Sequence, residues 1–75
     1  MRRYGAPYYG KRFLLNTNTY EVHDLDNEKD NCRINEIRLE HIEMFDTLLD
    51  VKVRLAFLRK KLNGCYYCLT RFDIG

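Results

Sequence analysis

The sequence has no serine, no tryptophan, a single proline and only four glycines among its 75 residues. The absence of serine excludes a serine nucleophile and its catalytic triad. The glycines, at positions 5, 10, 64 and 75, are too scattered to form a phosphate-binding loop of the Walker or Rossmann type. The longest strongly apolar run, residues 55–58, is far shorter than the roughly 18 residues that a membrane span requires.

The number of cysteines is odd, with thiols at Cys32, Cys65 and Cys68. Arg2 and Arg3 are followed by no apolar segment of the kind that a secretory leader contains, so we expect a cytoplasmic protein. In that reducing compartment thiols stay free or bind metal. An odd number also prevents all of them from pairing within one chain.

The length allows a single domain, and a composition of 45% hydrophobic and 32% charged residues is typical of a folded soluble protein. A chain this short buries only about 60% of its unfolded surface, so a metal, a disulfide or a partner often supplements the core. Residues 1–10 contain two glycines, the proline and three tyrosines. We expect them to form a flexible basic and aromatic lead-in to one zinc-binding domain over residues 11–75.

Alternating and turn-forming residues predict a small antiparallel sheet. Residues 11–15 and 20–23 have strand character and flank the turn sequence Asn-Thr-Asn-Thr at 16–19, which predicts a hairpin. A polar loop follows at residues 24–31, and a third strand is expected at 41–45.

One main C-terminal helix is the strongest local prediction. Asp46 is the expected N-cap, Arg59 to Lys61 would occupy the last turn, and Asn63-Gly64 would end the helix with Gly64 at positive φ. Apolar residues follow one another in steps of three and four: Leu48, Val51, Leu55, Leu58 and Leu62. This stripe indicates a core-facing side, although a dimer seam has the same pattern. The predicted fold is α+β, with a hairpin and a third strand packed on this helix.

A pair of cysteines after the helix predicts a metal site. Cys65 and Cys68 form a C-x2-C pair, which directs two thiolates to one point and supplies half of a tetrahedral zinc site. We expect Cys32 and His23 to complete the set of ligands. His41 is an alternative to His23, and Asp24 is a neighbour that can replace His23 or brace it.

Two other interpretations of the cysteines remain open. Cys65 and Cys68 can be a redox pair, although no thioredoxin-like βαβ pattern surrounds them. All three cysteines can also be reduced, buried apolar residues without metal.

The order of these features resembles the small zinc-binding domain at the N-terminus of the bacterial Ada DNA-repair methyltransferase. The resemblance spans most of residues 11–68 and is carried by Phe13-Leu14-Leu15-Asn16-Thr17, Val22-His23, Cys32, Phe45, Ala56 and Asn63-Gly64-Cys65-Tyr66-Tyr67-Cys68. It implies a zinc-stapled α+β fold and contact with DNA. The Ada domain begins its ligand set with two closely spaced cysteines, the first of which accepts a methyl group from DNA. His23 stands in that place here, with eight residues between it and Cys32, so methyl transfer does not carry over.

Charge is divided along the chain, with basic residues dominating 1–12 and 51–75 and acidic residues dominating 21–50, for a net charge of +2. These segments can attract one another within the fold, or a basic face can bind nucleic acid. The candidate nucleic-acid contacts combine cations for phosphate with an aromatic ring for stacking: Arg2, Arg3, Tyr8, Lys11, Arg12, Lys60 and Lys61.

The sequence thus predicts a structural-zinc module that binds nucleic acid or protein and has no catalytic activity, because a site of three cysteines and one histidine leaves zinc no open position. It gives no sign of a small-molecule substrate or a membrane contact. The first alternative is a metal-free interaction or structural protein that dimerises through the helix stripe. The second is a redox protein that uses Cys65 and Cys68.

Overall fold

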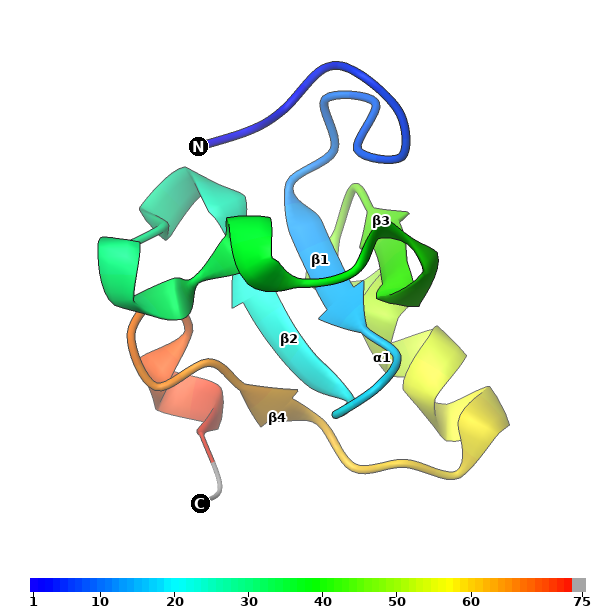
Figure 1. The fold of residues 1–75 in the computed structure, drawn as a ribbon. Helices are drawn as coiled ribbons and strands as arrows, with labels where there is room; N and C mark the ends of the chain where they lie inside the picture. The colour runs from blue at the N-terminus through cyan, green and yellow to red at the C-terminus, as the bar shows by residue number, and fades with distance from the viewer. Residues whose placement is uncertain (74–75) are drawn as a thin grey trace.

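The computed structural model describes residues 1–73, which form a four-stranded sheet and one α-helix (Figure 1). In chain order the elements are β1 (Phe13–Asn16), β2 (Glu21–Asp24), β3 (Ile42–Phe45), α1 (Leu48–Leu58) and β4 (Asn63–Gly64). The strands lie side by side in the order β3-β1-β2-β4. The α+β class is confirmed. No helix among residues 1–73 is long and apolar enough to cross a membrane.

The sheet is mixed, and the prediction of a three-stranded antiparallel sheet is therefore wrong. β1 pairs antiparallel with β2 and β3, as expected for a hairpin and a third strand. β4 adds a fourth strand parallel to β2, with Val22 opposite Gly64. The sequence indicated a helix end at Asn63-Gly64, whereas the chain has already left the helix and returns beside β2.

Close packing explains the glycine in this short strand. Gly64 is buried and does not adopt a positive φ, contrary to the expected helix end. A Cβ atom at this position would collide with the backbone oxygen of Leu69 and crowd the side chain of Phe72. The glycine therefore lets the segment after β4 fold back against the sheet.

The helix is shorter than predicted at both ends. Its N-cap is Thr47 and not Asp46, because the Thr47 hydroxyl accepts a hydrogen bond from the amide of Asp50 at 3.1 Å. Its C-cap is Arg59, whose left-handed conformation, with φ of 58°, ends the helix after Leu58. Arg59 to Lys61 thus follow the helix and do not form its last turn.

Both faces of the sheet are buried, each against a different layer. Cross-strand pairs share a face, so Phe13, Leu15 and Val22 point to one side while Leu14 and His23 point to the other. The first side packs on the predicted helix stripe, in a cluster that includes Val51, Leu55, Leu48 and Leu62. Four of the five stripe residues therefore belong to this core cluster and are not free to form a dimer seam, whereas Leu58 is half-buried outside the cluster.

The second side is covered by the segment between β2 and β3, which contains only short 3-10 turns and no α-helix. These turns are Leu25–Asn27, Asp30–Cys32, Ile34–Glu36 and Leu39–His41. Leu25 and Ile34 are buried against Leu14, together with three cysteines. This side of the core is thus built from irregular backbone and sulfur-bearing side chains.

Candidate metal centre

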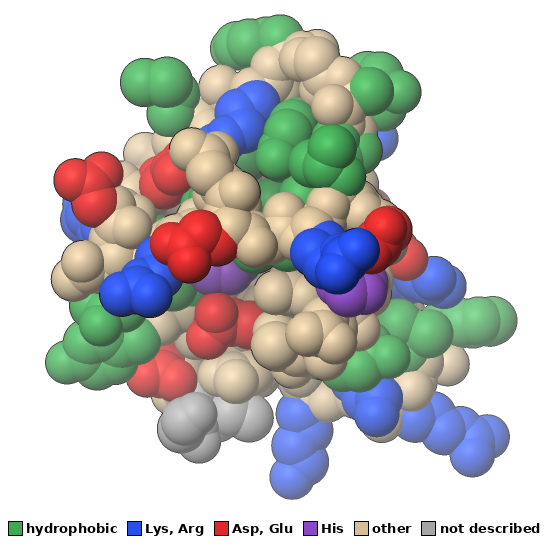
Figure 2. All heavy atoms as spheres, viewed as in Figure 1, with side chains coloured by type: hydrophobic (Ala, Val, Ile, Leu, Met, Phe, Trp, Pro, Cys, Tyr) green, Lys and Arg blue, Asp and Glu red, His purple; other side chains and the backbone are tan. Residues whose placement is uncertain are grey.

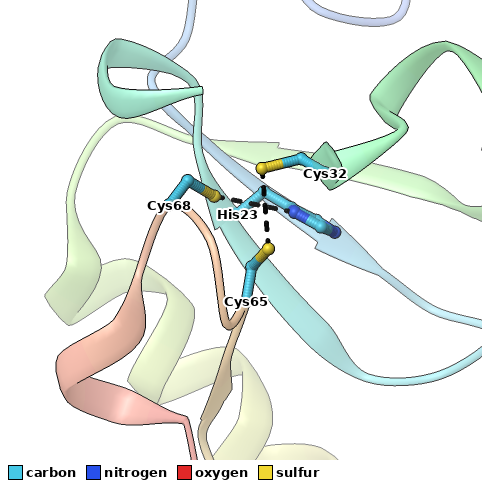
Figure 3. A group of neighbouring side chains, drawn as sticks. All are labelled: His23, Cys32, Cys65 and Cys68. Atoms are coloured by element: carbon cyan, nitrogen blue, oxygen red, sulfur yellow. Dashed lines mark hydrogen bonds between the residues drawn. The ribbon is translucent and has the colours of Figure 1, made fainter. Parts of the chain in front are cut away.

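Four side chains from distant parts of the chain converge on the irregular side of the sheet (Figure 3). They are His23, Cys32, Cys65 and Cys68, all buried, with one ligand atom of each lying within 4.8 Å of the others. The Sγ atoms of Cys32 and Cys65 are 3.6 Å apart, and Cys68 Sγ lies 3.7 Å from His23 Nδ1.

The separations of 3.6 and 3.7 Å are compatible with ligands of one metal ion and too long for a disulfide. A disulfide would bring two sulfurs to about 2.05 Å, and all three cysteines are free. Zinc bound tetrahedrally, at about 2.3 Å from sulfur and about 2.0 Å from nitrogen, places neighbouring ligand atoms roughly 3.5–4 Å apart. This group of three cysteines and one histidine can therefore hold a metal ion such as zinc.

Each ligand is positioned by a defined piece of backbone. His23 lies in β2 on the face that carries Leu14, and Cys32 ends the turn Asp30–Cys32. Cys65 follows β4 directly, where its amide donates to the backbone oxygen of Val22 at 2.8 Å. This bond extends the β2–β4 pairing by one step and so brings the C-x2-C turn next to His23.

Every sulfur in the group accepts a backbone hydrogen bond. The amide of Asp24 donates to Cys68 Sγ at 3.3 Å. The amide of Lys29 donates to Cys32 Sγ at 3.4 Å, and that of Tyr67 to Cys65 Sγ at 3.4 Å. Amide donors stabilise the thiolate form of cysteine, which is the form that binds metal.

A carboxylate orients the histidine. Nδ1 of His23 faces Cys68, while Nε2 lies 3.3 Å from Oε1 of Glu21. A carboxylate that accepts from the outer ring nitrogen fixes the tautomer and makes the inner nitrogen a better ligand. The sequence interpretation missed Glu21. Its spacing of two residues from His23 within a strand, which places both side chains on one face, was the available signal.

The two alternative ligands lie elsewhere. The carboxylate of Asp24 forms two hydrogen bonds of 2.9 Å with the guanidinium of Arg12, so Asp24 serves the group only through its backbone amide. His41 is half-buried and lines a cleft that also borders His23, but it is outside the converging group.

Without a bound cation, burial favours the neutral forms of the imidazole and thiol groups. It lowers the pKa of His23 to about 4, so the imidazole is neutral near pH 7, as a metal ligand must be. Burial also raises the pKa of the Cys32 and Cys68 thiols. A divalent cation reverses this preference, because it deprotonates the thiols that coordinate it.

We expect Glu21→Ala to weaken zinc binding by about 10- to 100-fold, the usual effect of removing a carboxylate that braces a ligating histidine. The measurement is a competition titration against a chromophoric zinc chelator. Glu36→Ala is the matched control, because Glu36 lines the same cleft without contacting His23, and its affinity should equal that of the wild type. Equal affinities for Glu21→Ala and the wild type would contradict a bracing role.

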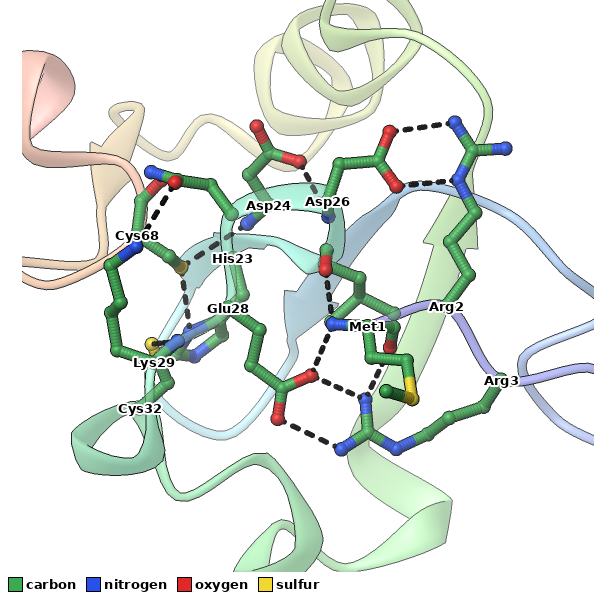
Figure 4. Close-up of polar contacts among 12 residues, drawn as sticks. Met1, Arg2, Arg3, His23, Asp24, Asp26, Glu28, Lys29, Cys32 and Cys68 are labelled. Carbon is green, nitrogen blue, oxygen red and sulfur yellow. Dashed lines mark hydrogen bonds and ion pairs between the residues drawn. The ribbon is translucent and has the colours of Figure 1, made fainter.

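Basic residues near the N-terminus neutralise acidic residues in the segment between His23 and Cys32 (Figure 4). Arg2 pairs with Asp26 through two hydrogen bonds of 2.8 Å. Arg3 pairs with Glu28 at 2.9 and 3.0 Å, and this interaction lowers the pKa of Glu28. The amino group of Met1 contacts Glu28 and the backbone oxygen of Leu25.

Within residues 1–73, some of the candidate nucleic-acid residues form side-chain contacts with other parts of the chain, and others are free of such contacts or more exposed to solvent. The guanidinium groups of Arg2, Arg3 and Arg12 form ion pairs within the chain. Tyr8 is half-buried beneath Arg3, and Lys60 lies over the ring of Tyr20 at 4.8 Å. Lys11 is half-buried and Lys61 is exposed. Figure 2 shows acidic and basic groups interspersed on the viewed face. Binding of nucleic acid by these residues stays a prediction.

No protein-family model, curated protein sequence or solved structure matches this chain. The resemblance to the Ada zinc domain therefore depends on the quoted residues alone and stays a prediction. Evidence for the function of this chain therefore comes from the geometry of the converging group.

Proposed function

We propose that this protein is a small structural-zinc module that mediates interactions and has no catalytic role. The observation that carries the proposal is the buried convergence of His23, Cys32, Cys65 and Cys68. Three amide donors to sulfur and one carboxylate beside the imidazole support it. Four protein ligands close the coordination of a tetrahedral zinc ion, so no position is left for a substrate or an activated water.

The role assigned to zinc is to hold the irregular side of the molecule together. The ion would join β2, the 3-10 segment and the turn after β4. Structural zinc contributes about 10–16 kcal/mol of apparent binding free energy near neutral pH. The net stability of proteins, at about 0.05–0.15 kcal/mol per residue, gives a 75-residue chain about 4–11 kcal/mol, which is comparable to this contribution or smaller.

A redox function is less well supported than a zinc site. A reactive cysteine needs a lowered pKa and access to its partner, whereas Cys65 and Cys68 are each 2% exposed. Burial also raises the pKa of Cys68, which disfavours its thiolate unless a cation is present.

The interaction partner that we favour is a protein and not a nucleic acid. Arg2, Arg3 and Arg12 already form ion pairs with carboxylates in the chain, which reduces their attraction for phosphate. Large apolar side chains are exposed on α1, and protein interfaces bury such groups.

Native mass spectrometry tests the zinc proposal. We expect one zinc ion per chain in the wild type and none retained by Cys65→Ser, because a serine hydroxyl is a poor zinc ligand. Tyr66→Ala is the matched control, since Tyr66 lies in the same turn and is 63% exposed, and it should keep its zinc. A wild-type chain that folds without any bound metal would contradict the proposal.

A further inference from the structure

The helix α1 carries a second apolar face that no described residue covers. Leu49, Val53 and Phe57 follow one another at intervals of four residues, which places them on one side of the helix. They are 68%, 62% and 79% exposed. This side is opposite Val51 and Leu55, which are buried against the sheet. In Figure 1 the helix lies behind the sheet, so its outer side faces away from the molecule.

The composition of the helix indicates that this outer face is covered in the functional state. Its sequence, LLDVKVRLAFL, has charged residues only at Asp50, Lys52 and Arg54. A surface helix usually has one apolar side and one polar side, whereas a helix that is apolar on both sides is usually buried. The pattern predicts burial on two sides, and the sheet provides only one.

The outer face continues into a shallow groove of about 490 Å³ beside the helix. One wall is fixed, because Arg54 forms hydrogen bonds of 2.9 and 3.1 Å with the carboxylate of Glu43. That pair also neutralises the charge of Arg54 next to the apolar surface. The groove is lined by Phe45, Asp50, Val53, Arg54 and Phe57. A side chain from a partner can therefore enter between the helix and Phe45.

We propose that a second copy of this chain covers the face, with the two α1 helices antiparallel about a two-fold axis near Val53. Leu49 of each copy then lies opposite Phe57 of the other, and the two Val53 residues meet at the axis. Such an interface uses the same patch twice, as is usual for a homodimer. The inference rests on the proposed function, because it names the partner of an interaction module.

Charge complementarity favours a second copy over an unrelated protein. Exposed carboxylates, Asp46 and Asp50, lie at the start of the helix, and exposed cations, Arg59 and Lys61, lie just after its end. An antiparallel pair brings the acidic end of each helix to the basic end of the other. The helix dipoles also oppose one another in this arrangement, which is favourable. The two ends of α1 thus carry opposite charges, and each end complements the other end of a second copy.

Sedimentation velocity of the zinc-loaded chain over about 1 µM to about 1 mM, the range of weak to moderate dimer affinities, tests the inference. The wild type should shift from monomer to dimer as its concentration rises. Phe57→Glu should remain a monomer throughout. Leu39→Glu is the matched control, since Leu39 is 59% exposed but lies outside α1, and it should dimerise as the wild type does. A wild type that stays monomeric overturns the inference, and so does equal disruption by both variants.

A mixing experiment tests the antiparallel arrangement itself. One variant carries Asp46→Lys and Asp50→Lys, and the other carries Arg59→Glu and Lys61→Glu. Each should dimerise more weakly than the wild type, because like charges then meet at both ends. An equal mixture should recover wild-type association as a heterodimer, whereas no recovery in the mixture overturns the arrangement. Native mass spectrometry of the same samples reports zinc separately, so loss of the dimer with zinc retained is distinct from failure of the zinc proposal.

Discussion

Removal of zinc with a strong chelator is expected to unfold this protein. The side of the core that contains Leu14, Leu25 and Ile34 is completed by the three cysteines and covered mainly by 3-10 turns, with Tyr8 packed against it. Those turns form few regular backbone hydrogen bonds, so the metal would supply most of what holds them in place. Circular dichroism and amide NMR spectra recorded before and after addition of the chelator would measure the loss of structure.

Re-addition of zinc should restore the folded spectra, whereas magnesium should not, because magnesium prefers oxygen ligands to thiolate and imidazole. This control separates a requirement for the metal from damage caused by the chelator. A chain that keeps its native NMR spectrum in excess chelator would favour the metal-free interpretation and remove the structural role assigned to zinc.

The two histidines should differ sharply when each is replaced by alanine. His23→Ala is expected to weaken zinc binding by at least about 100-fold, since it removes a ligand, and removing a group that merely braces a ligand already costs about 10- to 100-fold. His41→Ala should leave the affinity unchanged, because His41 is outside the converging group. Competition against a chromophoric chelator measures both affinities.

His23→Cys provides a further control for this pair. A set of four cysteine ligands is an ordinary structural zinc site, so this variant should bind zinc far more tightly than His23→Ala. Equal affinities for the wild type, His23→Ala and His41→Ala would show that the imidazole at position 23 does not ligate the metal.

The converging group was predictable from the sequence because the chain contains few residues with thiol or imidazole side chains. The C-x2-C pair is a recognisable metal-binding motif, and Cys32 is the only other cysteine in the sequence. The choice of His23 over His41 depends on strand pairing, which the sequence indicated only through the hairpin. In the structure His23 pairs with Leu14 and points to the same face as the cysteines. The contact between Glu21 and His23 follows from the alternation of side chains along β2, which places both on one face. Predicting this contact also requires knowing which face of the sheet is buried.

The end of the helix and the fourth strand were not predictable in the same way. Lys60 and Lys61 have good helix propensity, and Asn63-Gly64 is a typical helix end. In the structure Arg59 adopts a left-handed conformation, which the sequence does not favour at a non-glycine residue. The packing of Leu62 against the helix–sheet cluster and the pairing of Gly64 with Val22 depend on contacts distant in the chain. Tertiary packing thus overrides the local signal over residues 59–64.

The converging group draws on both halves of the chain, since His23 and Cys32 lie far from Cys65 and Cys68 in sequence. During synthesis, a nascent chain that ends before Cys65 presents one imidazole and one thiol, which make a weak and incomplete chelate. The group of four is complete only after Cys68 has been added and β4 has paired with β2. In the zinc module proposed here, metal acquisition would therefore wait until both parts of the group have been synthesised, and a product truncated before Cys65 would lack two of the four side chains.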